Sequence, residues 1–215
     1  WTSPDLSWQY ISMVDHITSI DALLSIYGDP AVASIDKQLD ELDFHCRTFI
    51  KNSPFMVLGT VGDVSPKGDH PGFVKVLNGK TLGIPDRKGN NRLDSLKNVI
   101  VDSRVALIFF IPGINETLRV NGHGKISTDP KILKIMHANG TLPLSALIVH
   151  VEEAYLHCAK AILRSKLWNR ESQYDRENLS PGPTIISDHS KKDSDEYAEY
   201  YQNAMEKMLE DEGHK

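Results

Sequence analysis

The feature that most restricts the fold is a series of short apolar or alternating runs in the middle of the chain. Gly, Asn, Asp and Pro separate these runs, which is typical of strands joined by turns. The sequence between them leaves little room for βαβ crossovers. The pattern predicts a barrel rather than a doubly wound sheet, in a fold that is mainly β with flanking helices (α+β). The predicted strands cover residues 55–60, 72–76, 81–84, 105–110, 117–120 and 146–151.

Helical patterns surround the predicted strands. Ser19 or Thr18 can cap a short helix that Gly28 ends. Apolar positions then recur at helical spacing from Ile35 to Ile50. Further helices are predicted over residues 92–101, after Asp129-Pro130, and from Glu152 towards Trp168. The chain therefore divides into an N-terminal helical extension (1–53), a barrel domain (54–170) and an acidic C-terminal helical tail (171–215).

Two turns carry specific expectations. The tetrapeptide Leu77-Asn78-Gly79-Lys80 predicts a hairpin, because Asn-Gly suits a type I′ turn. Residues 63–72 form a second polar segment that is rich in charge, Gly and Pro, and taken alone it reads as an exposed hairpin loop.

Composition excludes several classes of function. The formal net charge of -5 provides no electrostatic footprint for nucleic acid. No apolar run reaches the roughly 18 residues that a membrane span needs. The two cysteines, Cys46 and Cys158, do not form a disulfide framework, which favours a cytoplasmic protein. An anionic ligand must therefore be held by a local basic cluster rather than by the overall charge.

The segment with the clearest chemical character runs from Gly83 to Leu96 and reads as strand, polar turn and helix start. The turn contains Arg87, Lys88 and Arg92 beside Gly89-Asn90-Asn91. Backbone N–H groups at a helix N-terminus favour an anion, and an Arg fork suits phosphate. The alternative interpretation is a solvated loop whose basic side chains face water.

Six short motifs, taken in order, resemble those of one family. The motifs are residues 45–50, 53–55, 64–69, 84–92, 116–122 and 154–158, which read HCRTFI, SPF, VSPKGD, IPDRKGNNR, ETLRVNG and AYLHC. Over residues 18 to 170 the chain resembles the FMN-binding split-barrel superfamily, which includes pyridoxamine phosphate oxidase. The closer likeness is to its PPOX-class, FMN-dependent subgroup. The resemblance implies an FMN-binding split β-barrel of Greek-key type and a homodimer with the flavin at its interface.

The resemblance also implies a set of cofactor-binding residues. The polar turn would hold the FMN phosphate, the segment around residue 65 would lie beside the flavin, and Thr117 matches a position that hydrogen-bonds the isoalloxazine. A segment after residue 160 would reach the flavin of the second subunit. The implied residues are Ser65, Lys67, Pro85, Asp86, Arg87, Asn90, Asn91, Arg92, Thr117, Arg119, Arg164, Ser165 and Trp168. For Arg119, a surface ion pair is the alternative interpretation.

The resemblance implies an FMN-dependent oxidoreductase of a small-molecule substrate, with NAD(P)H as a candidate donor. The C-terminal Arg-Xaa-His pattern of true pyridoxamine phosphate oxidases is not found, so oxidation of vitamin B6 is not predicted. No catalytic residue is nominated and no metal site is predicted, since His45, His123, His150 and His157 lack zinc-type spacing. Two alternatives stay open: a non-catalytic flavin-binding or storage protein, and the same fold with F420 or haem.

Overall fold

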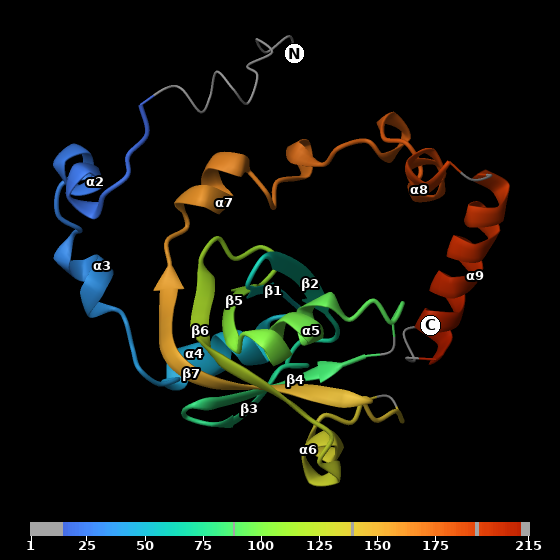
Figure 1. Ribbon diagram of the computed structural model, residues 1–215, viewed down its shortest axis with the longest axis horizontal. Coiled ribbons are helices and arrows are strands. Elements are labelled where there is room, and N and C mark those ends of the chain that lie inside the picture. Colours follow the sequence, from blue (N-terminus) through green and yellow to red (C-terminus); the bar gives the residue numbers. More distant parts are fainter. Residues whose placement is uncertain (1–14, 88, 139, 192–193, 212–215) are drawn as a thin grey trace. The chain divides into compact units, whose positions relative to one another are not determined.

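The computed structural model describes residues 15–87, 89–138, 140–191 and 194–211 (Figure 1). The chain divides into two compact units, with the boundary between Lys37 and Gln38. The first unit contains α2 (Ile20–Tyr27) and α3 (Val32–Asp36). The second contains helices α4 (Phe44–Asn52), α5 (Asp94–Val101), α6 (Pro130–Ile135), α7 (Lys160–Ser165), α8 (Gly182–Ser190) and α9 (Ser194–Asp211).

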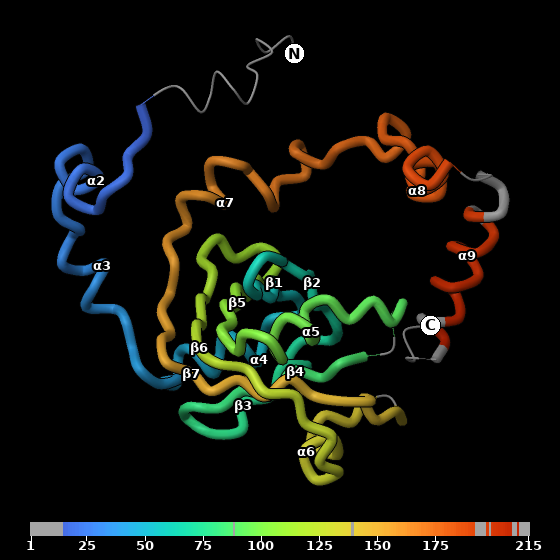
Figure 2. Tube along the Cα trace, viewed as in Figure 1, coloured from blue at the N-terminus to red at the C-terminus, as the bar shows by residue number. Residues whose placement is uncertain are grey.

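The seven strands of the described residues form one antiparallel sheet with the order β2-β1-β5-β6-β7-β4-β3. The long strands β6 and β7 run side by side at its centre (Figure 2). The sheet curves into a split barrel that is not closed, with β2 and β3 as its edges. The predicted α+β fold and split β-barrel are confirmed. The strands are β1 (Phe55–Thr60), β2 (Asp63–Gly68), β3 (Lys75–Asn78), β4 (Thr81–Asp86), β5 (Arg104–Phe110), β6 (Thr117–Ser127) and β7 (Ser145–His157).

The N-terminal helices follow their predicted signals only in part. Ser19 caps α2, since its Oγ accepts from the Ala22 N–H at 3.1 Å, and Gly28 ends the helix with φ 71°. The helical periodicity from residue 35 to 50 does not form one helix. Leu39 instead exchanges two backbone hydrogen bonds with Ala154 of β7 (2.9 and 2.8 Å), and α4 begins only after Asp43. Pairing with a strand overrides local helical spacing here.

Two segments have a different structure from the one the sequence predicts. The polar segment from residue 63 is not a loop, because residues 63–68 pair with β1 as the edge strand β2. Pro66 is tolerated there, since an edge strand can leave one side unpaired. The stretch from Glu152 is not helical either. It continues β7 to His157, paired with β6, and the helix α7 has only six residues.

The β3–β4 hairpin is present, but its turn differs from the prediction. Asn78 pairs with Thr81, so Gly79 and Lys80 occupy the turn. Neither has the positive φ that a type I′ turn requires. A register shift between Val76 and Asn78 moves the turn along by one residue. The Asn78 side chain then accepts from the Lys80 N–H at 2.9 Å.

Two helices pack against the sheet and contribute to its hydrophobic core. Helix α5 packs against β1, β2 and β6, whereas α4 packs against β3, β6 and β7. Burying one large aliphatic side chain contributes roughly 1.5–3 kcal/mol relative to leaving it exposed. The fully buried side chains include Leu42, Ile50, Met56, Leu58, Leu82, Leu107, Phe109, Leu118, Val120, Val149 and Val151. This core holds the strand ends and the start of α5 in place.

The C-terminal part contains α8 and α9, which pack against each other. The predicted acidic helix is present as α9, and α8 begins at Gly182, directly after Pro181. Of the helices described, none combines the length and the apolar character that crossing a membrane requires. Both cysteines are free thiols, Cys46 in the core and Cys158 on the surface.

Candidate functional site

A cavity of about 520 Å³ lies between the edge strand β2, the loop after β4, the start of α5 and the start of β7. Small-molecule sites in proteins have cavities of roughly 300–1,000 Å³. The predicted residues Ser65, Lys67, Asp86, Arg87, Asn90, Asn91 and Arg92 all line this cavity. Pro85 is buried in β4 and is not part of the lining. The fold therefore brings two predicted motifs, from β2 and from the basic turn, to one place.

The loop that leads into α5 has an unusual backbone. Asn91 and Leu93 both have φ 59°, in the left-handed region. That conformation is uncommon for a bulky residue such as Leu and costs of the order of 1–3 kcal/mol. Strain of this kind persists where the surrounding structure imposes it, often at binding sites. The strained loop is therefore consistent with a functional role of this segment.

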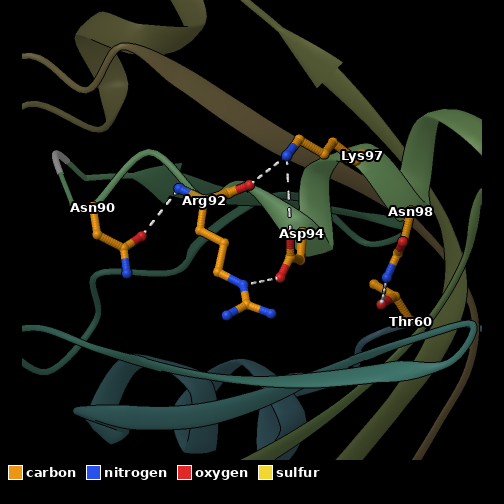
Figure 3. Close-up of polar contacts among 6 residues, drawn as sticks. All are labelled: Thr60, Asn90, Arg92, Asp94, Lys97 and Asn98. Atoms are coloured by element: carbon orange, nitrogen blue, oxygen red, sulfur yellow. Dashed lines mark hydrogen bonds and ion pairs between the residues drawn. The ribbon is translucent and has the colours of Figure 1, made fainter. Parts of the chain in front are cut away.

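The N-terminus of α5 opens into this cavity. The N-cap Leu93 offers no side-chain oxygen, so no side chain caps the helix. The side chain of Asn90 instead accepts from the Arg92 N–H at 3.1 Å, one residue before the cap (Figure 3). Asp94, Ser95 and Leu96 of the first turn line the cavity. Uncapped first-turn N–H groups favour an anion at this position.

Arg92 extends from the same loop and is exposed. Its Nε donates to the Asp94 carboxylate, and Lys97 Nζ donates to the Arg92 carbonyl oxygen at 2.7 Å (Figure 3). The hydrogen bond and charge of Asp94, together with the charge of Asp63, raise the pKa of Arg92 above its ordinary value. The guanidinium therefore lies among carboxylates that it neutralises.

The side chain of Arg87 is more deeply buried than that of Arg92. Its Nε donates to Asp69 Oδ2 at 2.9 Å, and the side chains are only 20% and 7% exposed. Asp69 follows the edge strand β2, so this ion pair joins the basic turn to the strand. The pair fixes Arg87 at the cavity wall and uses only one of its nitrogens.

Asp86 is the half-buried carboxyl group of the cavity. Burial raises the pKa of Asp86 above its ordinary value, and the charge of Lys67 lowers it in part. A carboxylate that is desolvated in this way destabilises the folded chain once it is ionised.

Asp86→Asn is expected to stabilise the ligand-free protein at neutral pH. Because the folded-state pKa is raised, the favourable contribution of Asp86 is present below its unfolded pKa and is lost as the pH rises through the folded value. In acid, the free energy of unfolding should therefore change with pH in the same way for the variant and the wild type. As the pH rises to 7, the variant should become more stable than the wild type. Thermal unfolding from pH 4 to pH 7 measures this, and a variant that is less stable at pH 7 contradicts it.

Thr117 and Arg119 do not line this cavity. They share the outer face of β6, opposite the core residue Leu118, and Arg119 lines a second cavity of about 290 Å³. Val64 of β2 lines both cavities, so they adjoin at this strand. Thr117 is only 4% exposed, and its Oγ1 is a buried polar atom without a partner in the described structure. An unsatisfied buried hydroxyl costs roughly 1–3 kcal/mol, so a ligand group that meets it would be favoured.

The predicted residues after β7 make contacts within their own chain. Arg164 Nε donates to the Lys160 carbonyl and Ser165 Oγ to that of Ile162, both within α7. The Trp168 ring N–H donates to the Ile114 carbonyl at 2.8 Å. Among the residues that the structure describes, no three His, Cys, Asp or Glu side chains are placed to hold a metal ion.

The structure adds residues that sequence reasoning missed. Ser95, Leu144 and Ser145 line the first cavity. Ser95 lies within the basic segment, so its place in the first helical turn was a usable signal. Leu144 and Ser145 lie some fifty residues further on, and only the pairing of β4 with β7 brings them to the site.

Comparison with known proteins identifies the family. The family model described as pyridoxamine 5'-phosphate oxidase matches residues 42–158, more than half of the chain. The chain therefore belongs to the pyridoxamine 5'-phosphate oxidase family, as its ordered motifs predict. A comparison with curated proteins found no match.

Several solved structures are similar. A putative pyridoxamine 5'-phosphate oxidase from Lactobacillus delbrueckii has 20% identity and a TM-score of 0.44, covering 55% of this chain and 98% of its own. An FMN-binding protein from Syntrophomonas wolfei has 12% identity and a TM-score of 0.41, with coverages of 52% and 83%. An FAD binding protein from Mycobacterium smegmatis has 14% identity and a TM-score of 0.38, with coverages of 55% and 97%.

Proposed function

We propose that the first cavity binds FMN and that the protein is an FMN-dependent oxidoreductase of a small-molecule substrate. The observation that carries the proposal is the convergence of Lys67, Arg87 and Arg92 with the uncapped N-terminus of α5 on one cavity. Membership of the pyridoxamine 5'-phosphate oxidase family supports a flavin as the ligand. When bound, FMN would supply electron-transfer chemistry, whereas the protein supplies placement and hydrogen bonds.

The donor groups that are present suit the parts of FMN. Arg87, Arg92 and the first-turn N–H groups of α5 would hold the phosphate, because charge-assisted hydrogen bonds are the strong ones. Ser65 and Lys67 of β2 would lie beside the flavin. The buried Thr117 hydroxyl, on the neighbouring outer face, would donate to the ring or accept from it and so gain the partner it lacks.

The purified protein is expected to bind FMN at least about tenfold more tightly than riboflavin. Two charge-assisted hydrogen bonds to the phosphate contribute roughly 1.5–3 kcal/mol each, which is more than the free-energy difference that a tenfold ratio of affinities requires. Quenching of flavin fluorescence on titration with the ligand-free protein measures both affinities. Equal affinity for the two flavins would rule out a phosphate site in this cavity.

A homodimer with the flavin at its interface is part of the proposal. Val64 and Leu144, at the rim of the cavity, are 71% and 70% exposed. A second copy that covers them would bury apolar surface and exclude water from the flavin. Light scattering is expected to give the mass of two chains. A monomer that still binds FMN tightly would argue against this arrangement.

One observation favours a second candidate, flavin binding or storage without turnover. Among the described residues, the lining of the first cavity contains no His, Tyr or Cys that could exchange a proton near neutral pH. Anaerobic addition of NAD(P)H separates the two candidates. Bleaching of the visible flavin absorbance, as expected for a reduced flavin, supports the oxidoreductase, and an unchanged spectrum supports storage. A cytoplasmic location also belongs to the proposal, since both thiols are free.

A further inference from the structure

A polar cluster on the outer face of β6 and β7 lies next to the proposed flavin site, and of its members only Thr117 is a proposed flavin contact. Thr117 pairs directly with His157, and Arg119 with Tyr155, so four side chains form two adjacent cross-strand pairs. Neighbouring residues on a strand point to opposite faces, so Tyr155 and His157 point away from the core side on which Ala154 is buried. The spacing of Tyr155 and His157, two residues apart on the strand, therefore places a phenol and an imidazole on the same face.

Arg119 is the charged centre of this cluster. Its guanidinium lies 5.3 Å from the centre of the Tyr155 ring, and this is the only interaction recorded for it among the described residues. The side chain is partly buried, and no described carboxylate neutralises it. A partly desolvated guanidinium without a counter-ion favours an anion. The ion pairs of Arg87, Arg92 and Arg104 show how the other arginines of the sheet region are satisfied.

The cavity in front of Arg119 has apolar walls. Val57, Gly59, Ala106 and Ile108 of β1 and β5 line it, with Arg119 and His157 as its polar members. Its volume of about 290 Å³ is close to the lower limit of roughly 300 Å³ for ligand sites. Such a site suits a ligand with one anionic end and a compact apolar body.

We propose that this second cavity binds a small apolar carboxylate, held by Arg119 and His157. The planar fork of Arg119 would take both carboxylate oxygens, with the Tyr155 ring fixing the plane of the guanidinium. The apolar walls favour a carboxylate on a hydrocarbon body over inorganic phosphate. Thr117, the proposed contact to the flavin ring, pairs with His157, so a carboxylate in this cavity would lie next to the flavin. The assignment of this ligand as the substrate therefore rests on the proposed flavin function.

The test uses benzoate as the probe and benzamide as its neutral counterpart, each titrated into the full-length protein by calorimetry. Benzoate is expected to bind saturably and benzamide at least about tenfold more weakly, since the charge-assisted pair is lost. Arg119→Gln should weaken benzoate binding by at least about tenfold, and Arg119→Lys should recover part of it. Arg104→Gln is the matched control and should change nothing, because Arg104 is an exposed arginine paired with Asp102.

A spectroscopic measurement keeps the proposal testable if the Arg119 variants do not fold. In the wild-type protein, benzoate should shift the ring resonances of His157, whereas those of His123, on β6 outside this cavity, should stay in place. Absence of saturable benzoate binding, equal binding of benzamide, or unchanged binding in Arg119→Gln overturns the proposal. A further outcome also overturns it: the wild type does not bind benzoate, and the mass of Arg119→Gln by light scattering differs from that of the wild type. Arg119 would then be an ion-pair partner between copies.

The outcome is separable from that of the flavin proposal. Affinity for FMN, measured on the same variants by fluorescence, should stay within about threefold of the wild type in Arg119→Gln, since the proposed FMN contacts are residues of the first cavity together with Thr117, and Arg119 is not one of them. Lost FMN affinity with intact benzoate binding would assign Arg119 to the flavin and overturn the carboxylate site. If the protein binds benzoate through Arg119 but does not bind FMN, the carboxylate site in the second cavity is supported and the flavin proposal is wrong.

Discussion

Arg92→Ala is expected to weaken FMN binding by about 10- to 100-fold and to leave riboflavin binding unchanged. The substitution removes a charge-assisted contact to the phosphate, which contributes roughly 1.5–3 kcal/mol. It also leaves the carboxylates of Asp63 and Asp94 without the charge that neutralises them at this loop. Both effects weaken the binding of an anionic phosphate. Neither changes a contact to the flavin ring, so riboflavin binding is not affected. Fluorescence titration with the two flavins measures the change.

Two variants define the control for this experiment. Arg92→Lys should recover only part of the affinity, since a point charge cannot reproduce the guanidinium fork. Arg104→Ala breaks the exposed ion pair of Arg104 with Asp102, which lies outside the cavity. Its two residues are separated in sequence by the same distance as Arg92 and Asp94. It should leave FMN affinity unchanged. Exposed pairs contribute little to stability, so both alanine variants should unfold as the wild type does. If Arg92→Ala unfolds the ligand-free protein, Arg92 has a structural role and the phosphate contact moves to Lys67 and Arg87.

Gly122→Ala is expected to destabilise the protein by about 3 kcal/mol, the upper range for overpacking. A Cβ on Gly122 would lie 1.9 Å from the carbonyl oxygen of His150, a backbone atom of the neighbouring strand. Gly122 lies at the register shift where β6 passes the bulge in β7, so the strands cannot separate without loss of sheet pairing. For a chain of this size the unfolding temperature should fall by roughly 10 °C.

Gly68→Ala is the matched control, because Gly68 also lies in a strand and has no positive φ. A Cβ there would meet Phe55 and Pro54 at 3.4 and 3.5 Å, which is ordinary van der Waals contact. Its unfolding temperature should stay close to that of the wild type. An equally stable Gly122→Ala protein would mean that β6 and β7 do not approach each other as closely as the structure shows.

The candidate sites show how local motifs and distant pairings combine. The basic turn and the Ser65–Lys67 segment are visible as polar runs in the sequence, and both line one cavity. Their common place depends on β2 and the loop after β4 meeting at the edge of the sheet, together with the Arg87–Asp69 ion pair. Thr117 and Arg119, which the resemblance assigns to the same cofactor, lie on the outer face beside a separate cavity.

What the sequence determined by itself is local: the strand runs, the cap and stop of α2, the basic turn before α5, and the motifs that identify the family. Each of these depends on neighbouring residues, whose backbone preferences and spacing act without the rest of the chain. Only the tertiary structure decided that residues 63–68 form a strand, that β7 continues to His157, and that Leu39 pairs with Ala154. In each case hydrogen bonds to a distant partner outweigh the weak local preference, and no pattern within a short window contains that partner.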